Sequence, residues 1–385
     1  MKDTSMSKPP HSDRKKRSGR EFQPSENSVN SVSTEPYNKE ASTTKKAPTG
    51  ISMEIRKVQI TGGSSYVITL PKDWIRSLNI KKNDPLGLIV QPDGTLLVTA
   101  EPAGEKIHRT KEFVVDSIED ATYLFRLLVG AYIMGYSIIL VKSTERISPM
   151  IMECVTNFTQ TAIGPEIIEE TMNSITIKDL LNPAEMPFDK TIKRIYIILK
   201  TMHEDAIATL QEKNSALIEE VTLRDNSVDR LQWLIARQSN IVLKDVTLAK
   251  RMGVTQEEAT YYFLISRIME RIGDHAVRIA ENMLPLIEEE IPEDVVTLVA
   301  QASSHALQIF SDSMHAWTRK DITSAHNTIE SISSLINRCE KITNKALNIK
   351  GKSSISMSYI AESIKRTGEY AADISELVIN HLVNE

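Results

Sequence analysis

Residues 270–281 read ERIGDHAVRIAE, and the acidic residues in this stretch recur at helical spacing. At about 100° per residue, Asp274 lies about 40° from Glu270 around a helix, and Glu281 lies about 20° from Glu270. The three carboxylates therefore share one narrow stripe of a predicted helix. Like charges along one helix face repel one another, so the stripe favours a compensating cation.

A second acidic pair precedes this stripe. Asp225 and Asp229 are four residues apart in a helical pattern and could face the stripe from a neighbouring helix. Because carboxylate oxygens suit hard cations, we expect a divalent or trivalent metal ion (Mg, Mn, Fe or Zn) bound by Asp225, Asp229, Glu270, Asp274 and Glu281. An ordinary solvated charged face is the alternative. His275 lies about 100° from Asp274 and is expected to pack or face solvent rather than bind the ion.

Residues 190–385 carry a helical pattern that begins after Pro183 and Pro187. It divides into two sets of three helices, 190–289 and 290–385, which indicates an internal duplication and two all-α bundles. The expected helices are 190–211, 216–238, 256–289, 294–318, 321–349 and 353–383. The last helix repeats the acidic stripe within an arc of about 60°, at Glu362, Glu369, Asp373 and Glu376.

The 270–281 stretch closely resembles the signature of the PhoU phosphate-signalling family. The stretch LRDNSVDRL at 223–231 resembles the second-helix motif of the same family. The resemblance spans residues 190–385 and implies two three-helix bundles with metal-binding E/D-x-x-x-D motifs. One departure is Arg278, which stands where the family often has Asn and puts a cation near the proposed site.

The second copy of the signature departs further. It reads KRTGEYAAD from Lys365 to Asp373, so its first acidic position is a lysine. The partner helix around residues 330–340 also lacks the paired aspartates. The resemblance therefore implies a weaker second metal site at Glu362, Glu369, Asp373 and Glu376.

Residues 1–50 contain no Leu or Ile, and 14 of the 50 are Ser or Thr. Such a segment cannot bury enough apolar surface to offset the entropy of ordering, so we expect a disordered basic tail. The net charge is +4 over residues 1–50, +2 over residues 51–100 and −11 over the remainder. Contact with nucleic acid is therefore expected in the first hundred residues, whereas the acidic remainder suits metal ions or protein partners.

Residues 51–100 have the pattern of a very small β-rich unit. Two strands around a Gly-rich turn are expected first, then a short helix opened by Pro71, then a second hairpin around Pro92-Asp93-Gly94. The expected strands and helix are 55–61, 66–70, 72–78, 85–90 and 96–99. Fifty residues bury too little surface to be stable alone, so we expect an obligate homodimer through this region.

This order of strand, turn, strand, LPK, helix and turn resembles the SpoVT/AbrB family. The likeness includes TGGSSYVITLPKDW at 61–74 and LNIKKND at 78–84, where Asn83-Asp84 replaces the common Gly-Asp. The resemblance implies a swapped-hairpin β-barrel in which two chains interleave, and it implies DNA binding through basic residues. The available cations are Arg56, Lys57, Lys72 and Arg76.

Residues 105–185 predict a short α/β segment with the order β-α-β-α-β. The expected elements are a strand at 112–115, a helix at 121–134, a strand at 136–141, a helix at 148–162 and an extended stretch at 167–177. We find no Gly-rich phosphate loop and no catalytic cluster in it.

The whole chain is therefore expected to be multidomain, with a small swapped-hairpin β-barrel head, a short α/β segment and tandem three-helix bundles. Two cysteines exclude a disulfide scaffold. The uncharged stretch 127–141 is too short to span a membrane, and the N-terminus lacks the apolar core of a signal peptide. We therefore expect a cytoplasmic protein with no membrane insertion.

The combination of an AbrB-like head and PhoU-like bundles resembles archaeal phosphate-uptake regulators. The first hypothesis is a DNA-binding transcriptional regulator of phosphate uptake, whose bundles sense a signal or dock a partner. The second is an adaptor that does not bind DNA, contacts a phosphate transporter or a kinase, and uses the β-rich domain for dimerisation. A carboxylate-metal enzyme is the least expected, because it requires Glu-x-x-His pairs on facing helices and residues 190–385 contain none.

Overall fold

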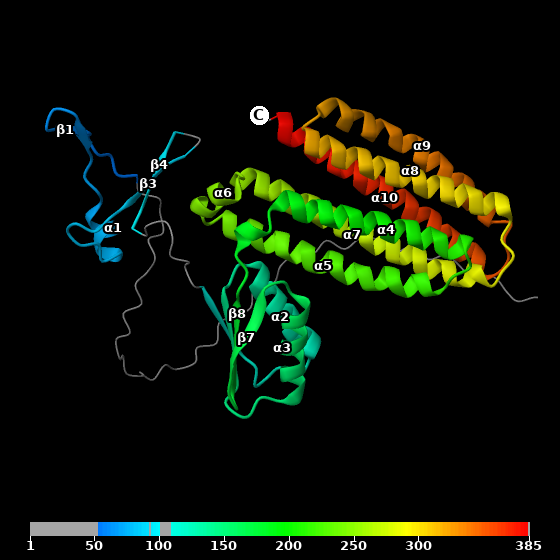
Figure 1. The fold of residues 1–385 in the computed structure, drawn as a ribbon, viewed down its shortest axis with the longest axis horizontal. Helices are drawn as coiled ribbons and strands as arrows, with labels where there is room; N and C mark the ends of the chain where they lie inside the picture. Colours follow the sequence, from blue (N-terminus) through cyan, green and yellow to red (C-terminus); the bar gives the residue numbers. More distant parts are fainter. Residues whose placement is uncertain (1–52, 92–93, 101–108, 384–385) are drawn as a thin grey trace, which may run out of the picture. The chain divides into compact units, whose positions relative to one another are not determined.

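The computed structural model describes residues 53–91, 94–100 and 109–383 (Figure 1). The disordered tail expected at residues 1–50 lies outside the described residues. The chain divides into two compact units, one ending at Asp84 and the other beginning at Pro85.

The first unit contains one β-hairpin and one short helix. Strand β1, Gln59–Thr61, pairs in antiparallel with β2, Ser65–Val67. Gly62 and Gly63 turn the chain between them at φ values of +65° and +84°, a region that favours glycine. Helix α1, Lys72–Ser77, begins directly after Pro71, as the sequence predicts. Both strands are shorter than expected.

The apolar side chains of this unit lie largely in solvent. None of residues 53–84 is buried. The exposed large apolar residues include Met53, Ile55, Val58, Ile60, Tyr66, Val67, Ile68 and Leu78. One copy of the unit therefore has no core of its own. Exposed apolar surface of this kind is what the predicted dimer would bury. The swapped-hairpin barrel and the dimer remain predictions.

The second unit begins with a hairpin close to its expected position. Strand β3, Gly87–Val90, pairs in antiparallel with β4, Leu96–Thr99. Its large apolar side chains are also exposed, namely Leu88, Val90, Leu96 and Leu97.

The α/β segment is a four-stranded sheet with two helices. Its elements are β5 (Thr110–Val114), α2 (Ala121–Ile133), β6 (Ile138–Lys142), α3 (Pro149–Thr161), β7 (Pro165–Glu170) and β8 (Ser174–Asp179). The strand order is β5-β6-β8-β7, with β5 and β6 parallel and the other neighbours antiparallel. The core of this segment packs Leu124, Leu128, Val155, Phe158, Ile175 and Ile177.

One sequence prediction for this segment is wrong. The single extended stretch expected at residues 167–177 is a hairpin, because the chain turns between β7 and β8. The Thr171 hydroxyl oxygen accepts a hydrogen bond from the backbone N–H of Ser174, and the Thr171 N–H bonds back to the Ser174 carbonyl oxygen. The segment is therefore β-α-β-α-β-β.

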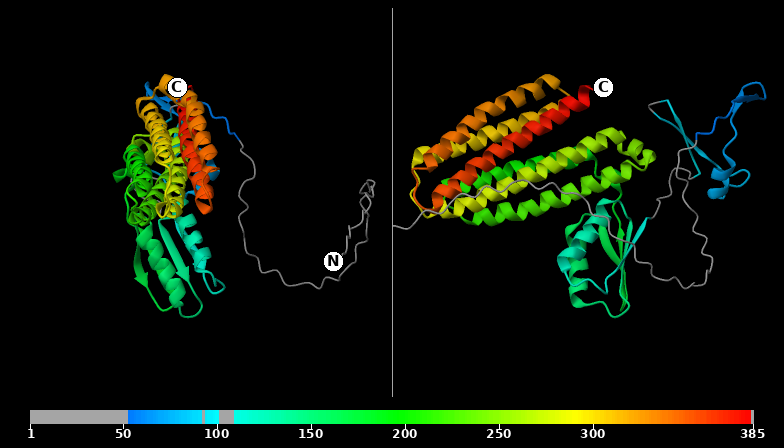
Figure 2. Two further views of the ribbon diagram at one scale, coloured as in Figure 1. Left: turned by 90° about the vertical axis from the view of Figure 1, so that its right-hand side faces the viewer. Right: turned by 180° about the vertical axis from the view of Figure 1, so that it is seen from behind.

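Seven helices follow a short 3₁₀ turn, Pro183–Glu185. The first set consists of α4 (Phe188–Gln211), α5 (Ala216–Val242), the short α6 (Val246–Met252) and α7 (Gln256–Ile287). The second set consists of α8 (Glu293–Arg319), α9 (Ile322–Ala346) and α10 (Lys352–Val383). Figure 2 shows the two sets lying along each other. Within the described residues, no helix combines the length and the apolar character needed to cross a lipid bilayer.

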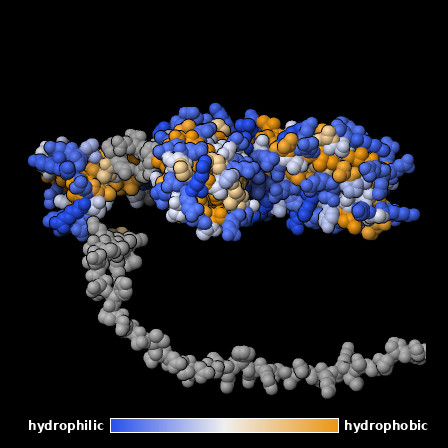
Figure 3. All heavy atoms as spheres, turned by 90° about the horizontal axis from the view of Figure 1, so that it is seen from below, coloured by the Kyte–Doolittle hydropathy of each residue, from blue (hydrophilic) through white to orange (hydrophobic). Residues whose placement is uncertain are grey.

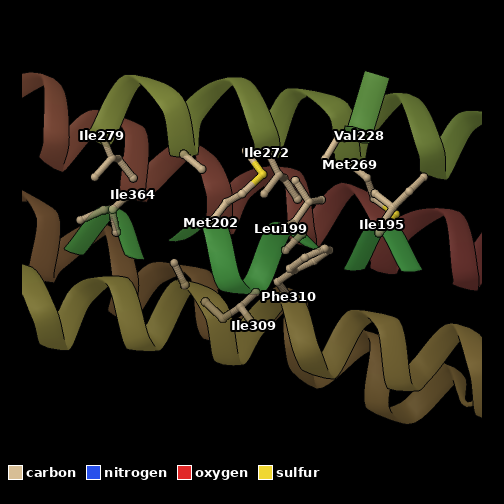
Figure 4. Close-up of a cluster of buried hydrophobic side chains, with 14 of the residues drawn as sticks. Ile195, Leu199, Met202, Val228, Met269, Ile272, Ile279, Ile309, Phe310 and Ile364 are labelled. Atoms are coloured by element: carbon tan, nitrogen blue, oxygen red, sulfur yellow. The ribbon is translucent and has the colours of Figure 1, made fainter. Parts of the chain in front are cut away.

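A single hydrophobic core runs through both sets. In Figure 4, Ile195 and Leu199 of α4 lie with Ile272 of α7, Phe310 of α8 and Ile364 of α10. Each of these five side chains is fully buried. Helices α7 and α10 form the central seam, so the two sets make one continuous array rather than two separately packed bundles.

Helix α5 also holds the α/β segment. The buried Arg237 guanidinium pairs with Asp179 at an N···O distance of 2.6 Å and donates to the backbone oxygens of Tyr132 and Tyr136. Because a buried cation is costly unless it is paired and hydrogen-bonded, these contacts define a firm joint between segment and array.

Candidate metal centre and nucleic-acid interface

Four carboxylates come together between helices α5 and α7. Asp225 and Asp229 lie one turn apart on α5, and Glu270 and Asp274 lie one turn apart on α7. Their charges act on one another, since Asp229, Asp274 and Glu270 each raise the pKa of Asp225. The structure thus brings together four of the five side chains that the sequence predicts as metal ligands.

Asp225 reaches α7 because Gly273 has no side chain there. A Cβ at Gly273 would lie 2.8 Å from Asp225 Oδ1 and 3.2 Å from Leu199 Cδ2. The same Oδ1 is buried and finds no hydrogen-bond partner among the described residues. Glycine inside a helix costs about 1 kcal/mol relative to alanine. Here the missing side chain leaves room for the Asp225 carboxylate, whose unpartnered oxygen a proton or a cation would satisfy.

Burial is the main cause that raises the pKa of all four carboxyl groups. Together with the neighbouring charges it raises the pKa of Asp225 to about 7. Arg267 opposes the shift by lowering the pKa of Asp229, Glu270 and Asp274, and its guanidinium lies 3.7 Å from Glu270. Asp225 therefore keeps its proton up to about neutral pH unless a cation replaces it.

Glu281 does not join the cluster. It is exposed on α7, seven residues and therefore about 10 Å beyond Asp274 along the helix axis. Its angle around the helix suggested that Glu281 belongs to the cluster, but its distance along the helix axis separates it from Asp274. Arg278 packs its guanidinium 5.9 Å from the ring centroid of Tyr359 on α10, although it still lowers the pKa of Asp274. His275 packs against an aromatic ring of α10 rather than entering the cluster.

The donor chemistry of the cluster fits a hard cation. Four carboxylates, one with an orphaned oxygen, are the type of ligand that Mg²⁺, Mn²⁺ or iron takes. The side chains are not yet arranged as a ligand shell, because no three His, Cys, Asp or Glu groups in the described part of the chain are placed to hold a metal ion. Ion binding would require Asp225, Asp229, Glu270 and Asp274 to draw closer together.

The matching position of the second helix set is built differently. Gly368 on α10 corresponds to Gly273, and the side chain that a Cβ there would meet first is Leu335 of α9. Ile332 of the same helix lies next to it. Apolar side chains therefore fill the space that Asp225 takes in the first set.

The second acidic stripe also has cations of its own. Glu362 pairs with Lys365 at 2.6 Å and with Arg366 at 3.1 Å, and Arg366 also bonds Glu369 at 3.0 Å. Burial, followed by the charges of Glu376 and Glu369, raises the pKa of Asp373. The residues of this stripe do not fit a metal site as well as those of the first set, because Lys365 and Arg366 already pair with two of its carboxylates.

The four basic residues that are expected to contact DNA lie in the first compact unit and are exposed. Arg56 and Lys57 lie just before β1, and Lys72 and Arg76 lie on α1. Arg56 pairs with a neighbouring glutamate, and Arg76 lies 3.8 Å from an aspartate on its own helix. Exposed pairs of this kind are weak and leave the cations available to an external polyanion.

Comparison with known proteins finds similarity in two segments of the chain. The PhoU domain matches residues 192–283, and the family described as antidote-toxin recognition MazE, bacterial antitoxin, matches residues 59–106. Phosphate-specific transport system accessory protein PhoU homolog 1 of Thermotoga maritima is 24% identical over 196 residues, which cover 49% of this chain and 82% of that protein. The PhoU homolog of Clostridium acetobutylicum is 22% identical, over 46% of this chain and 81% of that protein.

Two solved structures are similar over about half of the chain. PhoU from Pseudomonas aeruginosa aligns with a TM-score of 0.45 and 18% identity, covering 51% of this chain and 95% of that one. The phosphate transport system regulatory protein PhoU from Streptococcus pneumoniae aligns with a TM-score of 0.43 and 16% identity, covering 51% and 94%.

The protein thus combines a small strand-rich N-terminal region, an α/β segment with a four-stranded sheet, and an all-α C-terminal array. More particularly, residues 192–283 match the PhoU domain, and residues 59–106, which precede it, match the MazE antitoxin family. Both resemblances drawn from the sequence are confirmed.

Proposed function

We propose that this protein is a DNA-binding transcriptional regulator of phosphate uptake. The observation that carries the proposal is the union, in one chain, of a MazE/AbrB-type unit with exposed cations and a PhoU domain with a carboxylate cluster. The relatives that match the helical array are named as accessory proteins of phosphate-specific transport. We assign the protein to the cytoplasm and give it no catalytic role.

The N-terminal unit supplies the DNA contact in this proposal. Two copies of residues 51–100 interleave, which buries the apolar side chains that one copy leaves exposed. Arg56, Lys57, Lys72 and Arg76 of each copy then contact phosphate groups of the duplex. A twofold protein of this kind favours a palindromic site, because the symmetry of the two half-sites mirrors that of the dimer.

The helical array supplies the sensor or the docking surface for a partner. A divalent or trivalent cation held by Asp225, Asp229, Glu270 and Asp274 replaces the proton of Asp225 and cancels the repulsion among the four carboxylates. Binding of the metal ion therefore stabilises the packing of α5 against α7. The names of the relatives support a phosphate transporter as the partner. A signalling protein is the other partner that the proposal allows.

Sequencing the DNA fragments retained by the full-length protein tests this function. Sheared genomic DNA is mixed with the purified protein, and retained fragments are compared with those retained by the Arg56→Ala, Lys57→Ala, Lys72→Ala, Arg76→Ala variant. We expect enrichment of a defined palindromic site by the natural chain and its loss in the variant.

The adaptor hypothesis predicts a different outcome. An adaptor that uses its β-rich domain for dimerisation alone would retain random fragments or none, and the four substitutions would change nothing. Either result would refute DNA-binding regulation and leave the PhoU domain to act through a transporter or a kinase.

A further inference from the structure

The carboxylate cluster already has one cation beside it. The Arg267 guanidinium lies 3.7 Å from Glu270 Oε2, one turn away on the same helix. Of the three arginines on α7, a helix that the structure describes in full, only Arg267 forms an ion pair. The other two, Arg271 and Arg278, lie 5.8 and 5.9 Å from the centroids of tyrosine rings on α10. Arg267 is therefore the arginine of α7 that pairs with the cluster.

The charge of Arg267 acts on carboxylates of both helices. Burial raises the pKa of three carboxyl groups and Arg267 lowers it, and these groups are Asp229 on α5 and Glu270 and Asp274 on α7. The pKa of Asp225 is raised by burial and by three acidic neighbours, without an opposing cation. One guanidinium thus offsets part of the repulsion and leaves Asp225 Oδ1 without a partner among the described residues.

The pair between Arg267 and Glu270 is easily broken. At 3.7 Å its atoms are farther apart than a hydrogen bond allows, and the Arg267 side chain is 47% exposed. Exposed ion pairs contribute little to stability, and a long arginine side chain can turn its charged end into water. In the space-filling view, a mostly hydrophilic surface is interrupted by hydrophobic patches (Figure 3). A guanidinium that leaves the cluster therefore has water and polar groups to receive it.

We propose that Arg267 is the resident counter-ion of the carboxylate cluster and that a metal ion entering the cluster displaces it. This inference rests on the proposed metal site. A divalent ion carries twice the charge of a guanidinium and takes carboxylate oxygens as ligands. Arg267 therefore competes with the metal ion and lowers the affinity of the site. The concentration at which the array responds to metal is set in part by this arginine.

Calorimetric titration of the full-length chain with Mn²⁺ tests the competition. Arg267→Gln removes the counter-ion and should bind Mn²⁺ about fivefold more tightly than the natural chain. Arg267→Lys keeps the charge and should bind Mn²⁺ with nearly the natural affinity. Arg278→Gln is the matched control, because it removes the same charge from the same helix, at a guanidinium that lies against Tyr359. Its affinity should change by less than about twofold.

Arginine modification with phenylglyoxal tests the displacement itself. The reagent attacks the unprotonated guanidine, whereas neighbouring carboxylates favour the protonated form. Binding of Mn²⁺ should therefore speed the modification of Arg267, followed by mass spectrometry of its peptide, and leave that of Arg278 unchanged. An unchanged rate at Arg267 on addition of Mn²⁺ would overturn the proposal.

The titration distinguishes failure of this inference from failure of the metal site. If Arg267→Gln binds Mn²⁺ no more tightly than the natural chain, Arg267 does not compete with the ion and the metal site still stands. If neither protein binds Mn²⁺, the metal site fails and the counter-ion role fails with it. Binding by Arg267→Gln alone would support the proposal.

Discussion

The Asp225 carboxylate is placed where burial and three acidic neighbours all oppose its ionisation. The array treats another buried titratable group differently. His203 is fully buried, its Nε2 lies 2.9 Å from the Thr367 hydroxyl oxygen, and burial lowers its pKa to about 4. His203 is therefore neutral and hydrogen-bonded, whereas Asp225 Oδ1 lacks a partner among the described residues. At the residue scale, Asp225 is the position that responds to a proton or a cation.

The Asp225→Asn substitution should change how stability depends on pH in the presence of a chelator. The unfolded carboxyl group ionises near pH 4, whereas the folded one keeps its proton to about pH 7. The folded state binds the extra proton between these values, so the natural protein loses stability as pH rises from about 4 to 7. The variant should lose that slope and be more stable at pH 8 by on the order of 2 kcal/mol.

Urea unfolding at several pH values measures this effect. Asp205→Asn is the control, because that aspartate already pairs with Arg224 of α5. A slope retained in Asp225→Asn would show that another group causes it.

At the element scale, hydrophobic periodicity predicted the six long helices, because each presents an apolar stripe over several turns. It missed α6, whose seven residues are defined by the Asp245 cap and by Gly253 in the left-handed region. The carboxylate pairs were predictable, since a spacing of four residues fixes their angle. The contact of Asp225 with Gly273 was not predictable, because the spacing between two helices is set by tertiary packing. The glycine in the middle of α7 was the only local sign of this contact in the sequence.

The two acidic stripes should differ in their response to metal. Asp229→Asn with Asp274→Asn removes two charges from the first cluster while nearly preserving shape, so the increase in melting temperature caused by Mg²⁺, Mn²⁺ or iron should disappear. Without metal, this variant should be at least as stable as the natural chain, because repulsion is relieved.

The matched change in the second stripe is Glu369→Gln with Asp373→Asn. Its metal-dependent shift in melting temperature should equal that of the natural chain, because Lys365 and Arg366 already pair with Glu362 and Glu369 of this stripe. Calorimetry with and without chelator makes the comparison. If metal shifts neither variant nor the natural protein, the first cluster is an ordinary charged face.

The joint between α5 and the α/β segment should depend on Arg237. Arg237→Ala leaves Asp179 buried without its cation, an imbalance that costs about 3–5 kcal/mol. Hydrogen exchange should therefore accelerate in residues 110–179 more than in α8–α10. Adding Asp179→Asn removes the unpaired charge and should recover part of the protection. Uniform acceleration over the whole chain would contradict a local joint.

At the scale of the whole molecule, the proposed DNA contacts and the proposed metal ligands lie in different compact units. The charge distribution follows the same division, since residues 1–84 carry a net charge of +7 and residues 85–385 a net charge of −12. Variants of the carboxylate cluster should therefore leave the charges that face DNA unchanged. The exposed apolar side chains of residues 53–84 mark the region whose environment must change on dimerisation.

The salt dependence of DNA affinity tests the central claim most directly. Fluorescence anisotropy would follow the full-length chain on the fragment that it enriches, over a range of salt concentrations. The logarithm of the binding constant should fall linearly with the logarithm of salt concentration, and Lys72→Ala should reduce the slope by about one for each copy bound. The variant with Ala at Arg56, Lys57, Lys72 and Arg76 should remain folded and lose specific binding. If that variant binds the same fragment with unchanged affinity at every salt concentration, the N-terminal unit is not the DNA-binding domain.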